Sequence, residues 1–248
     1  MTSLEQQVQD NLRRVNERIS TAAQAVSRDR SGITLLAVSK TFGPEAVLAA
    51  ARAGQRAFGE NYVQEAVDKI AALARLAEAG ETAAAGLQWH FIGPIQSNKT
   101  RPIAEHLDWV HSIDRLKIAQ RLSEQRPAER PPLDVLLQVN ISGEASKSGV
   151  SPDELPALAQ AVAALPRLRL RGLMAIPEPE DDPQRQRLPL ARMRMMFAQL
   201  RTGLPRLDTL SMGMSADLEA AVAEGATMLR IGTAIFGTRS RPTLEPHA

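Results

Sequence analysis

The chain has 248 residues, of which 44% are apolar and 23% are charged. These proportions are typical of a folded globular protein and exclude a wholly disordered, fibrous or coiled-coil chain. The formal net charge of +2 gives no electrostatic footprint for nucleic acid, and the absence of cysteine excludes disulfides and thiolate catalysis. The four histidines lack the spacing of a helical zinc motif, so no metal site is predicted.

The first twenty residues are polar and amphipathic, without the apolar core of a signal peptide. The longest apolar runs are far shorter than the roughly 20 residues that a membrane span requires. We therefore expect a cytoplasmic protein that does not contact a membrane.

Helix-like and strand-like segments alternate along the chain. Apolar residues recur with helical spacing from about 3 to 28, and the run 33–39 is a continuous apolar segment of strand length. The predicted strands cover 33–39, 56–59, 87–93, 108–113, 133–140, 168–176, 209–214 and 228–236. The predicted helices between them cover 44–53, 61–79, 96–106, 114–125, a segment opened by 151–153, 187–201 and 215–224.

Eight strands separated by helix-length segments predict an α/β fold, a single (β/α)8 TIM-type barrel with an extra N-terminal helix. The chain length matches the roughly 250 residues of that fold, and an open doubly wound sheet is the alternative. We expect residues 1–30 to form a helix packed on the barrel, 31–240 to form the barrel, and 241–248 to form a tail.

Lys40 stands where the chemistry of such a barrel gathers, at the carboxyl end of a strand. It directly follows the apolar run of the first strand. Partial desolvation there disfavours the ammonium form, and a free amine attacks aldehydes to form a Schiff base. The alternative is a lysine whose ammonium simply reaches solvent at a strand end.

Two glycine-containing loops follow the seventh and eighth strands: the first glycine loop, 211–215 (SMGMS), and the second glycine loop, 230–237 (RIGTAIFG). Loops at these positions form the phosphate site of many barrels, because small residues let backbone N–H groups approach the anion. Tight turns alone are the alternative explanation for the glycines. With Lys40, the loops predict a site for a phosphorylated aldehyde, either pyridoxal 5′-phosphate (PLP) or the sugar phosphate of a Schiff-base aldolase.

Arg230 bears on the choice of ligand. Arg230 and Gly232 point to the same face of a strand, so Arg230 faces the barrel interior if Gly232 lines the phosphate end. A guanidinium donates hydrogen bonds but does not release a proton, so it would keep a pyridine nitrogen unprotonated. The ring would then be a weak electron sink. The alternative is an arginine paired with a carboxylate such as Glu60.

Seven ordered motifs resemble the pyridoxal phosphate homeostasis proteins of the YggS/PROSC type, a family related to the N-terminal domain of alanine racemase. They are AVSKT (37–41), FGENYVQEAVDKI (58–70), WHFIGPIQSNK (89–99), HSIDR (111–115), SKSG (146–149), LSMGMSADLEAA (210–221) and MLRIGTAIFG (228–237). The resemblance covers nearly the whole chain, from about Leu35 to Gly237.

The resemblance implies a single barrel that carries PLP on a lysine. Lys40 matches the Schiff-base lysine of the family, and Arg230 matches the arginine that faces the pyridine nitrogen. The residues that match the phosphate loops are Ser211, Met212, Gly213 and Ser215 in the first glycine loop, and Gly232 and Thr233 in the second. Asn61, His90 and Asn140 match cofactor-pocket positions.

The resemblance also implies a protein of PLP homeostasis that holds the cofactor without established catalysis, as a monomer in transient contact with PLP-dependent apo-enzymes. The alternative is a weakly active PLP-dependent racemase or decarboxylase. A racemase needs acid and base groups on both faces of the substrate carbon. Tyr62 is the only tyrosine, and neither it nor His90 or His111 is an evident second base. No catalytic residue is therefore predicted.

Overall fold

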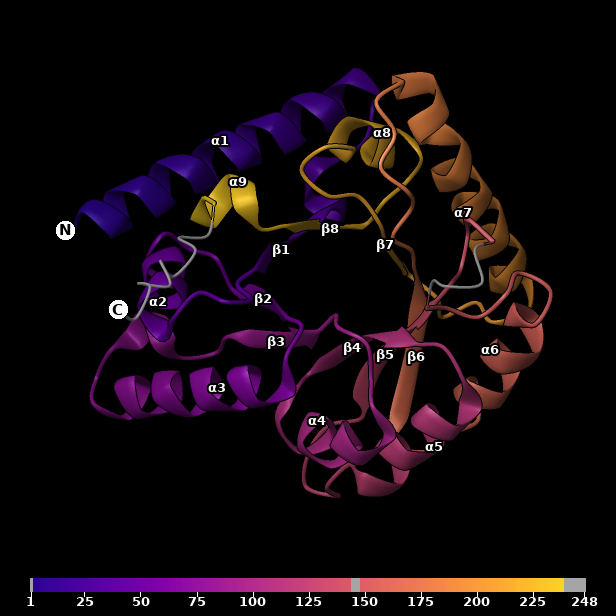
Figure 1. Cartoon of the computed structure of the whole chain (residues 1–248), viewed down its shortest axis with the longest axis horizontal. Helices are drawn as coiled ribbons and strands as arrows, with labels where there is room; N and C mark the ends of the chain where they lie inside the picture. The colour runs from indigo at the N-terminus through magenta and orange to yellow at the C-terminus, as the bar shows by residue number, and fades with distance from the viewer. Residues whose placement is uncertain (1, 144–147, 239–248) are drawn as a thin grey trace, which may run out of the picture.

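The computed structural model describes residues 2–143 and 148–238. In this part of the chain, eight parallel strands close into a barrel in the order β1 to β8, with β8 paired back to β1. Figure 1 shows the helices as an outer ring around the strands. The prediction of a (β/α)8 barrel is confirmed, and the alternative of an open sheet is wrong.

The secondary structure follows the predicted alternation. The strands are β1 (Thr34–Val38), β2 (Ala57–Glu60), β3 (Gln88–Phe91), β4 (Trp109–Ile113), β5 (Leu133–Gln138), β6 (Leu168–Met174), β7 (Thr209–Ser211) and β8 (Met228–Ile231). The α-helices are α1 (Ser3–Ala25), α2 (Pro44–Arg52), α3 (Val63–Glu78), α4 (Thr100–His106), α5 (Leu116–Gln125), α6 (Leu155–Ala163), α7 (Pro183–Gly203), α8 (Leu218–Ala223) and α9 (Thr233–Phe236).

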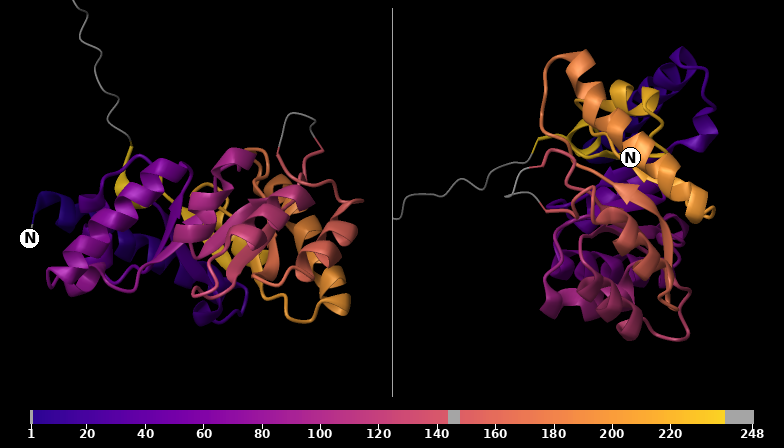
Figure 2. Two further views of the ribbon diagram at one scale, coloured as in Figure 1. Left: turned by 90° about the horizontal axis from the view of Figure 1, so that it is seen from below. Right: turned by 90° about the vertical axis from the view of Figure 1, so that its right-hand side faces the viewer.

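Helix α1 covers the side of the barrel and lies against α2, α8 and α9 (Figures 1 and 2). Its first turn is fixed by a capping box, in which the Thr2 hydroxyl accepts from the Glu5 N–H and the Glu5 carboxylate accepts from the Thr2 N–H. Its buried face carries Val8, Leu12 and Ile19, which keep the helical spacing seen in the sequence. The predicted tail at 241–248 lies outside the described residues.

The two faces of each strand meet different surroundings. Leu36, Ala57 and Met228 form one small cluster, and Trp109, Leu136 and Met174 form another, both separate from the main core. Leu35, Ala37 and Phe58 belong instead to the large core between the strands and the helices. Because side chains alternate along a strand, the residues in step with Leu36 and Met228 point into the barrel. Arg230 is two residues from Met228 on β8 and has the same phase. Lys40 is four residues from Leu36, just beyond the end of β1, and also has the same phase.

Strand β8 is shorter than its apolar sequence suggests. The predicted strand 228–236 is wrong beyond Ile231, where Gly232 leaves the extended conformation and α9 begins. The N–H groups of Ile235 and Phe236 both donate to the Gly232 carbonyl oxygen, at 2.8 and 3.0 Å. A local turn therefore wins over strand propensity at this end of the barrel.

Several helix starts also differ from the prediction by a few residues, and two of them have a clear local cause. Helix α6 begins at Leu155, because the Ser151 hydroxyl accepts from the Glu154 N–H and forms a separate turn. Helix α7 begins earlier than predicted, at Pro183, where the Asp182 carboxylate caps the N–H groups of Gln184 and Arg185. Among the described residues, no helix has the length and apolar character needed to span a bilayer.

Candidate functional site at the carboxyl ends of the strands

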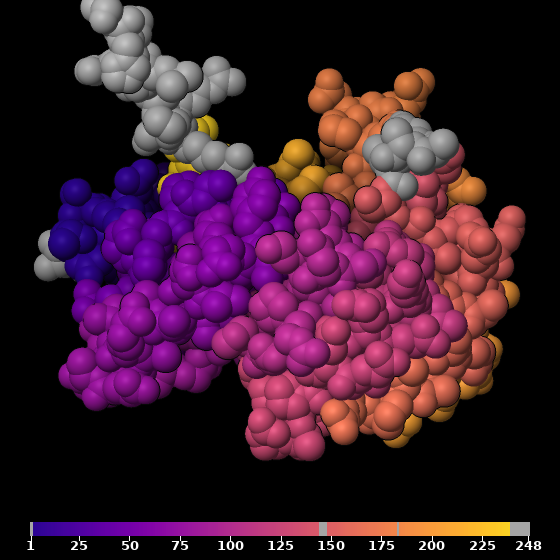
Figure 3. Space-filling model, turned by 60° about the horizontal axis from the view of Figure 1, so that its bottom comes forward, coloured from indigo at the N-terminus to yellow at the C-terminus, as the bar shows by residue number. Residues whose placement is uncertain are grey.

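The carboxyl end of the barrel, called the mouth below, brings Lys40 and the second glycine loop together. Lys40, Val38, Phe42, Gly232 and Thr233 line one cavity of about 290 Å³. Figure 3 shows a depression in the molecular surface between the purple N-terminal segments and the orange α7. The predicted pairing of an amine with a glycine loop therefore exists as a shared cavity.

Gly232 lets the backbone of the second glycine loop lie close to β1. A Cβ atom at this position would lie 3.1 Å from the Val38 carbonyl oxygen and 3.3 Å from the Val38 Cβ. The next residue, Thr233, is exposed and starts α9, and the first N–H groups of a helix have no acceptor within the helix. Gly232 and Thr233, which carries a hydroxyl, thus line the same cavity as Lys40.

The residues of the first glycine loop make different kinds of contact. The Met212 side chain is buried in the core and its N–H donates to the Met228 carbonyl oxygen, so it offers no donor to a ligand. Gly213 has φ +93°, which an L side chain rarely adopts. The Ser215 carbonyl oxygen accepts from Arg18, whose guanidinium also binds Glu219. Neither Gly213 nor Ser215 is among the residues that line the Lys40 cavity, so the phosphate role of this loop stays a prediction.

Arg230 points into the barrel and is 4% exposed. Its guanidinium donates to the Ser211 hydroxyl at 2.7 Å and to the Ala175 carbonyl oxygen at 2.8 Å. Glu60 lies on the outer side of the wall, where it accepts from Lys69 and Ser39. The predicted inward direction of Arg230 is confirmed, and the alternative pairing with Glu60 is wrong.

A line of hydrogen bonds runs from Arg230 into the barrel. The Ser211 hydroxyl lies 3.1 Å from His111 Nδ1, and His111 Nε2 lies 3.0 Å from His90 Nδ1. Because Arg230 is only a donor, the Ser211 hydroxyl accepts from it and donates its own proton onward. This order assigns the proton to Nε2 in both histidines. His90 Nε2 ends the line without a hydrogen-bond partner among the described residues.

Burial keeps these groups in defined charge states. Desolvation lowers the pKa of His90 to about 3, and desolvation followed by the charges of His90 and Arg230 lowers the pKa of His111 well below its ordinary value. Both histidines are therefore neutral at physiological pH. Desolvation also lowers the pKa of Arg230, to about 10, which leaves the guanidinium charged near pH 7.

Asn61 and Asn140 line a second cavity at the mouth, of about 440 Å³, together with Met214 of the first glycine loop. The Asn61 Oδ1 atom is buried and has no hydrogen-bond partner among the residues described. Asn140 Oδ1 accepts from the Gly143 N–H. His90 is not among the residues that line either cavity, because it lies deeper, stacked on Trp109 with ring centroids 5.2 Å apart.

The sequence alone did not reveal the side chains that hold this site from outside. Asn11 of α1 donates to the Ile235 carbonyl oxygen in α9 at 2.8 Å, and Arg18 of α1 donates to Ser215 in the first glycine loop. Inside the barrel, His111, which the sequence analysis considered only as a second base, contacts the Ser211 hydroxyl. No signal in the sequence distinguishes these contacts, because each joins segments more than 90 residues apart.

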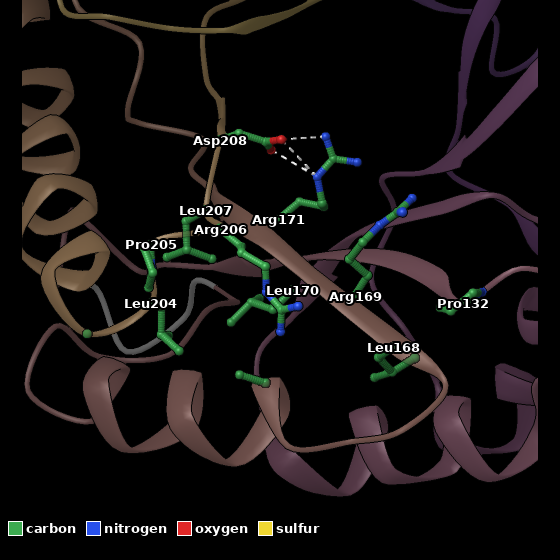
Figure 4. Close-up of a pocket in the computed structure, with 12 residues that line it drawn as sticks. Pro132, Leu168, Arg169, Leu170, Arg171, Leu204, Pro205, Arg206, Leu207 and Asp208 are labelled. Carbon is green, nitrogen blue, oxygen red and sulfur yellow. Dashed lines mark hydrogen bonds and ion pairs between the residues drawn. The ribbon is translucent and has the colours of Figure 1, made fainter.

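A larger cavity, of about 780 Å³, lies at the opposite end, where β6 and β7 begin. Figure 4 shows Arg171 paired there with Asp208, and Arg169 beside it on β6. The Arg171 guanidinium also lies over the Trp109 ring, 4.7 Å from its centroid. Size alone would favour this cavity, but none of the predicted site residues lines it, whereas Lys40, Gly232 and Thr233 line the smaller cavity at the mouth.

The chain matches the family model of the alanine racemase N-terminal domain over residues 6–240. The alanine racemase of Corynebacterium glutamicum, with 17% identity and a TM-score of 0.64 over 97% of this chain and 63% of that one, shares the fold. Much nearer relatives exist. The chain is 62% identical to the pyridoxal phosphate homeostasis protein of Pseudomonas aeruginosa, over 94% of this chain and 96% of that protein.

It is also 60% identical to the protein of that name from Escherichia coli, over 92% of this chain and 95% of the relative. Among solved structures, PipY of Synechococcus elongatus with PLP bound is 36% identical, with a TM-score of 0.77 over 93% of this chain and all of that one. The chain therefore belongs to the pyridoxal phosphate homeostasis protein family.

Proposed function

We propose that this chain binds PLP at the mouth of the barrel, with the aldehyde held as a Schiff base by Lys40 and the phosphate held by the two glycine loops. The observation that carries this proposal is the single cavity shared by Lys40, Gly232 and Thr233. It supports the proposal because a phosphorylated aldehyde needs an amine near small residues that can approach its phosphate.

The groups at the mouth fit this cofactor. The second glycine loop approaches β1 so closely that a side chain at Gly232 would crowd Val38. Because Gly232 has no side chain, the cavity stays open at that point. The unpartnered Asn61 Oδ1 is a buried polar atom that a ligand group can satisfy. Arg230 is a charged donor held inside the barrel, and in this proposal its guanidinium faces the ring nitrogen.

When bound, PLP supplies an electrophilic aldehyde and a ring that can take up electrons from a substrate. Arg230 limits the second property. Its guanidinium keeps its proton, and Ser211 and the Ala175 carbonyl fix its direction. The neutral Ser211–His111–His90 line carries no acid that could protonate the ring in its place.

We propose binding and delivery of PLP rather than turnover of a substrate. His90 and His111 are fully buried and bonded to each other, so neither side chain can reach a substrate carbon. Tyr62, at the start of α3, is 55% exposed and is not among the residues that line the Lys40 cavity. A second acid or base opposite Lys40 therefore has no candidate among these three residues.

The partners proposed with this function are PLP itself and, transiently, PLP-dependent apo-enzymes. We also propose a monomer located in the cytoplasm. Light scattering during size-exclusion chromatography checks the oligomeric state, and a mass of twice 26.9 kDa contradicts the monomer.

The test of the site is an absorption spectrum of the purified protein, followed by borohydride reduction and mapping of the labelled peptide. Lys40→Ala is expected to lose the visible absorbance of the Schiff base and to keep the melting temperature of the wild type, because Lys40 lies at the mouth. Lys117→Ala, which changes an exposed lysine on α5, is the matched control. Label on any other lysine contradicts the proposed anchor.

A separate experiment tests the absence of turnover. The loaded protein is incubated with single amino acids, and the chirality of the amino acid and the release of carbon dioxide are followed over time. We expect neither to change. Racemisation or carbon dioxide release that depends on Lys40 would establish the enzymatic alternative.

A further inference from the structure

Lys69 is a buried lysine that the proposed binding site does not use. Its side chain, on α3, is 4% exposed. Its ammonium donates to three oxygen atoms: the Ser39 carbonyl at 2.7 Å, Glu60 Oε1 at 2.8 Å and Glu65 Oε1 at 2.6 Å. An ammonium has three protons, so its donor capacity is filled.

Two of these contacts reach the backbone on either side of Lys40. The Ser39 carbonyl, held by Lys69, belongs to the peptide unit that precedes Lys40. The Thr41 N–H, in the peptide unit that follows Lys40, donates to the same Glu65 oxygen that accepts from Lys69. The main chain that carries Lys40 is thus tied at both peptide units to one ion pair on α3.

Thr41 shows that this tie holds an unfavourable conformation. Its φ of +68° lies in the left-handed region, which is a rare position for a β-branched residue. Such a conformation persists only where the surrounding contacts determine it. The Glu65 carboxylate, which accepts the Thr41 N–H, is one such contact, and the Phe42 N–H, which donates to the Ser39 carbonyl oxygen at 3.1 Å, is another.

The ion pair lies behind the site and not in it. Ser39 and Glu60 alternate with Val38 and Asn61 along their strands, so their side chains face α3 while Val38 and Asn61 line the mouth cavities. Lys69 and Glu65 line neither cavity. Whatever they contribute to ligand binding, they contribute through the backbone of Lys40.

We propose that Lys69 and Glu65 are positioning residues that fix the turn through residues 39–41 and so aim the Lys40 amine into the mouth cavity. This inference deepens the proposed PLP function and rests on it. Stability alone is a poor explanation for the cluster, because apolar residues of similar volume usually stabilise a buried position at least as well as an ion pair.

Glu60 supports this interpretation from a different direction. Its carboxylate is fully buried, and its second oxygen has no hydrogen-bond partner among the described residues. Desolvation raises the pKa of Glu60, against the opposing effect of Lys69. The cluster therefore buries a carboxyl group beside Ser39 at a cost in desolvation, as expected where a polar group is kept to hold a conformation.

The experiment compares stability with the reactivity of Lys40. Lys69→Met leaves the Glu60 charge unpaired and is expected to lower the melting temperature. Adding Glu60→Gln removes that charge and is expected to restore the melting temperature. The rate at which added PLP labels Lys40, measured by absorbance and by borohydride trapping, is expected to stay about tenfold below the wild type in the double variant.

Glu65→Ala supplies a second and milder change, because the Glu65 side chain is 26% exposed. It is expected to slow labelling of Lys40 to a similar extent and to speed hydrogen exchange of the Thr41 amide in the PLP-free protein at least tenfold. Glu65→Gln keeps an acceptor oxygen and is expected to recover most of both effects. Glu78→Ala, at an exposed position of the same helix, is the matched control.

The outcomes test the proposed PLP function and the positioning role of Lys69 and Glu65 separately. Wild-type protein that is not labelled at Lys40 contradicts the proposed function. Wild-type protein that is labelled at Lys40, with the Lys69→Met/Glu60→Gln and Glu65→Ala variants labelled at the same rate, overturns the positioning role alone. If Lys69→Met does not fold in either background, the Glu65 variants decide the question.

Discussion

Replacing Gly213 with alanine is expected to destabilise the first glycine loop by an amount that the structure allows us to estimate. Gly213 has φ +93°, and an L residue in the left-handed region costs roughly 1–2 kcal/mol. The new Cβ would also lie 2.4 Å from the Ala221 Cβ and 2.8 Å from Leu229 Cδ2. Leu229 can move its side chain, but Ala221 can move only with the backbone of α8. Crowding of this kind costs about 1–3 kcal/mol more.

Urea denaturation of the PLP-free protein measures the total, which is expected to be about 2–5 kcal/mol. Gly225→Ala is the matched control, because Gly225 has φ +91° and its nearest contact, Arg194 Cδ, would be 3.6 Å away. That variant is expected to lose only the conformational part, roughly 1–2 kcal/mol. Adding Ala221→Gly to Gly213→Ala is expected to give a favourable coupling energy. Equal losses for the two alanine variants would refute the crowding argument.

Two further predictions concern the ligand and the pH dependence. Thr233→Val is expected to weaken PLP binding by about 1–2 kcal/mol, or about 5- to 30-fold, by removing one hydroxyl donor to a charged group; an unchanged dissociation constant in a titration removes Thr233 from the site. Because burial lowers the pKa of His90 from 6.5 to about 3, the unfolded chain binds more protons in this window, and stability falls as the pH drops through it. Between pH 6.5 and 4.5 the His90 contribution to this loss is about 2 kcal/mol. Urea denaturation at pH 7 and 4.5 measures it, and His90→Gln is expected to show a smaller loss than the wild type; equal losses contradict the neutral, buried state of His90.

The fold was predictable because its signals are local. Each strand is a short apolar run and each following helix has its own apolar period, so the eight units can be counted without knowing their contacts. The errors fall where a local hydrogen bond overrides propensity. At the end of β8, the carbonyl of Gly232 captures two N–H groups and converts an apolar strand-like run into α9.

The candidate site was predictable in part for a similar reason. Lys40, Gly232 and Thr233 are at strand ends, and closure of a barrel places strand ends together. The neighbours of Arg230 were not predictable, because the contact of His111 with Ser211 spans 100 residues and depends on the register of the closed sheet. The cluster around Lys69 was missed because a helical lysine carries no sign of whether it faces solvent or the wall of the barrel.

Helix α1 lies outside the eightfold repeat, yet its side chains form hydrogen bonds to both glycine loops. Asn11 donates a hydrogen bond to α9 in the second loop, and Arg18 donates one to Ser215 in the first loop. The two residues are seven positions apart on the helix, a rise of about 10 Å along its axis. Because both contacts come from one continuous helix, they restrict independent movement of the two loops. The distance between the two loops is thus fixed from α1 as well as by the strands that carry the loops.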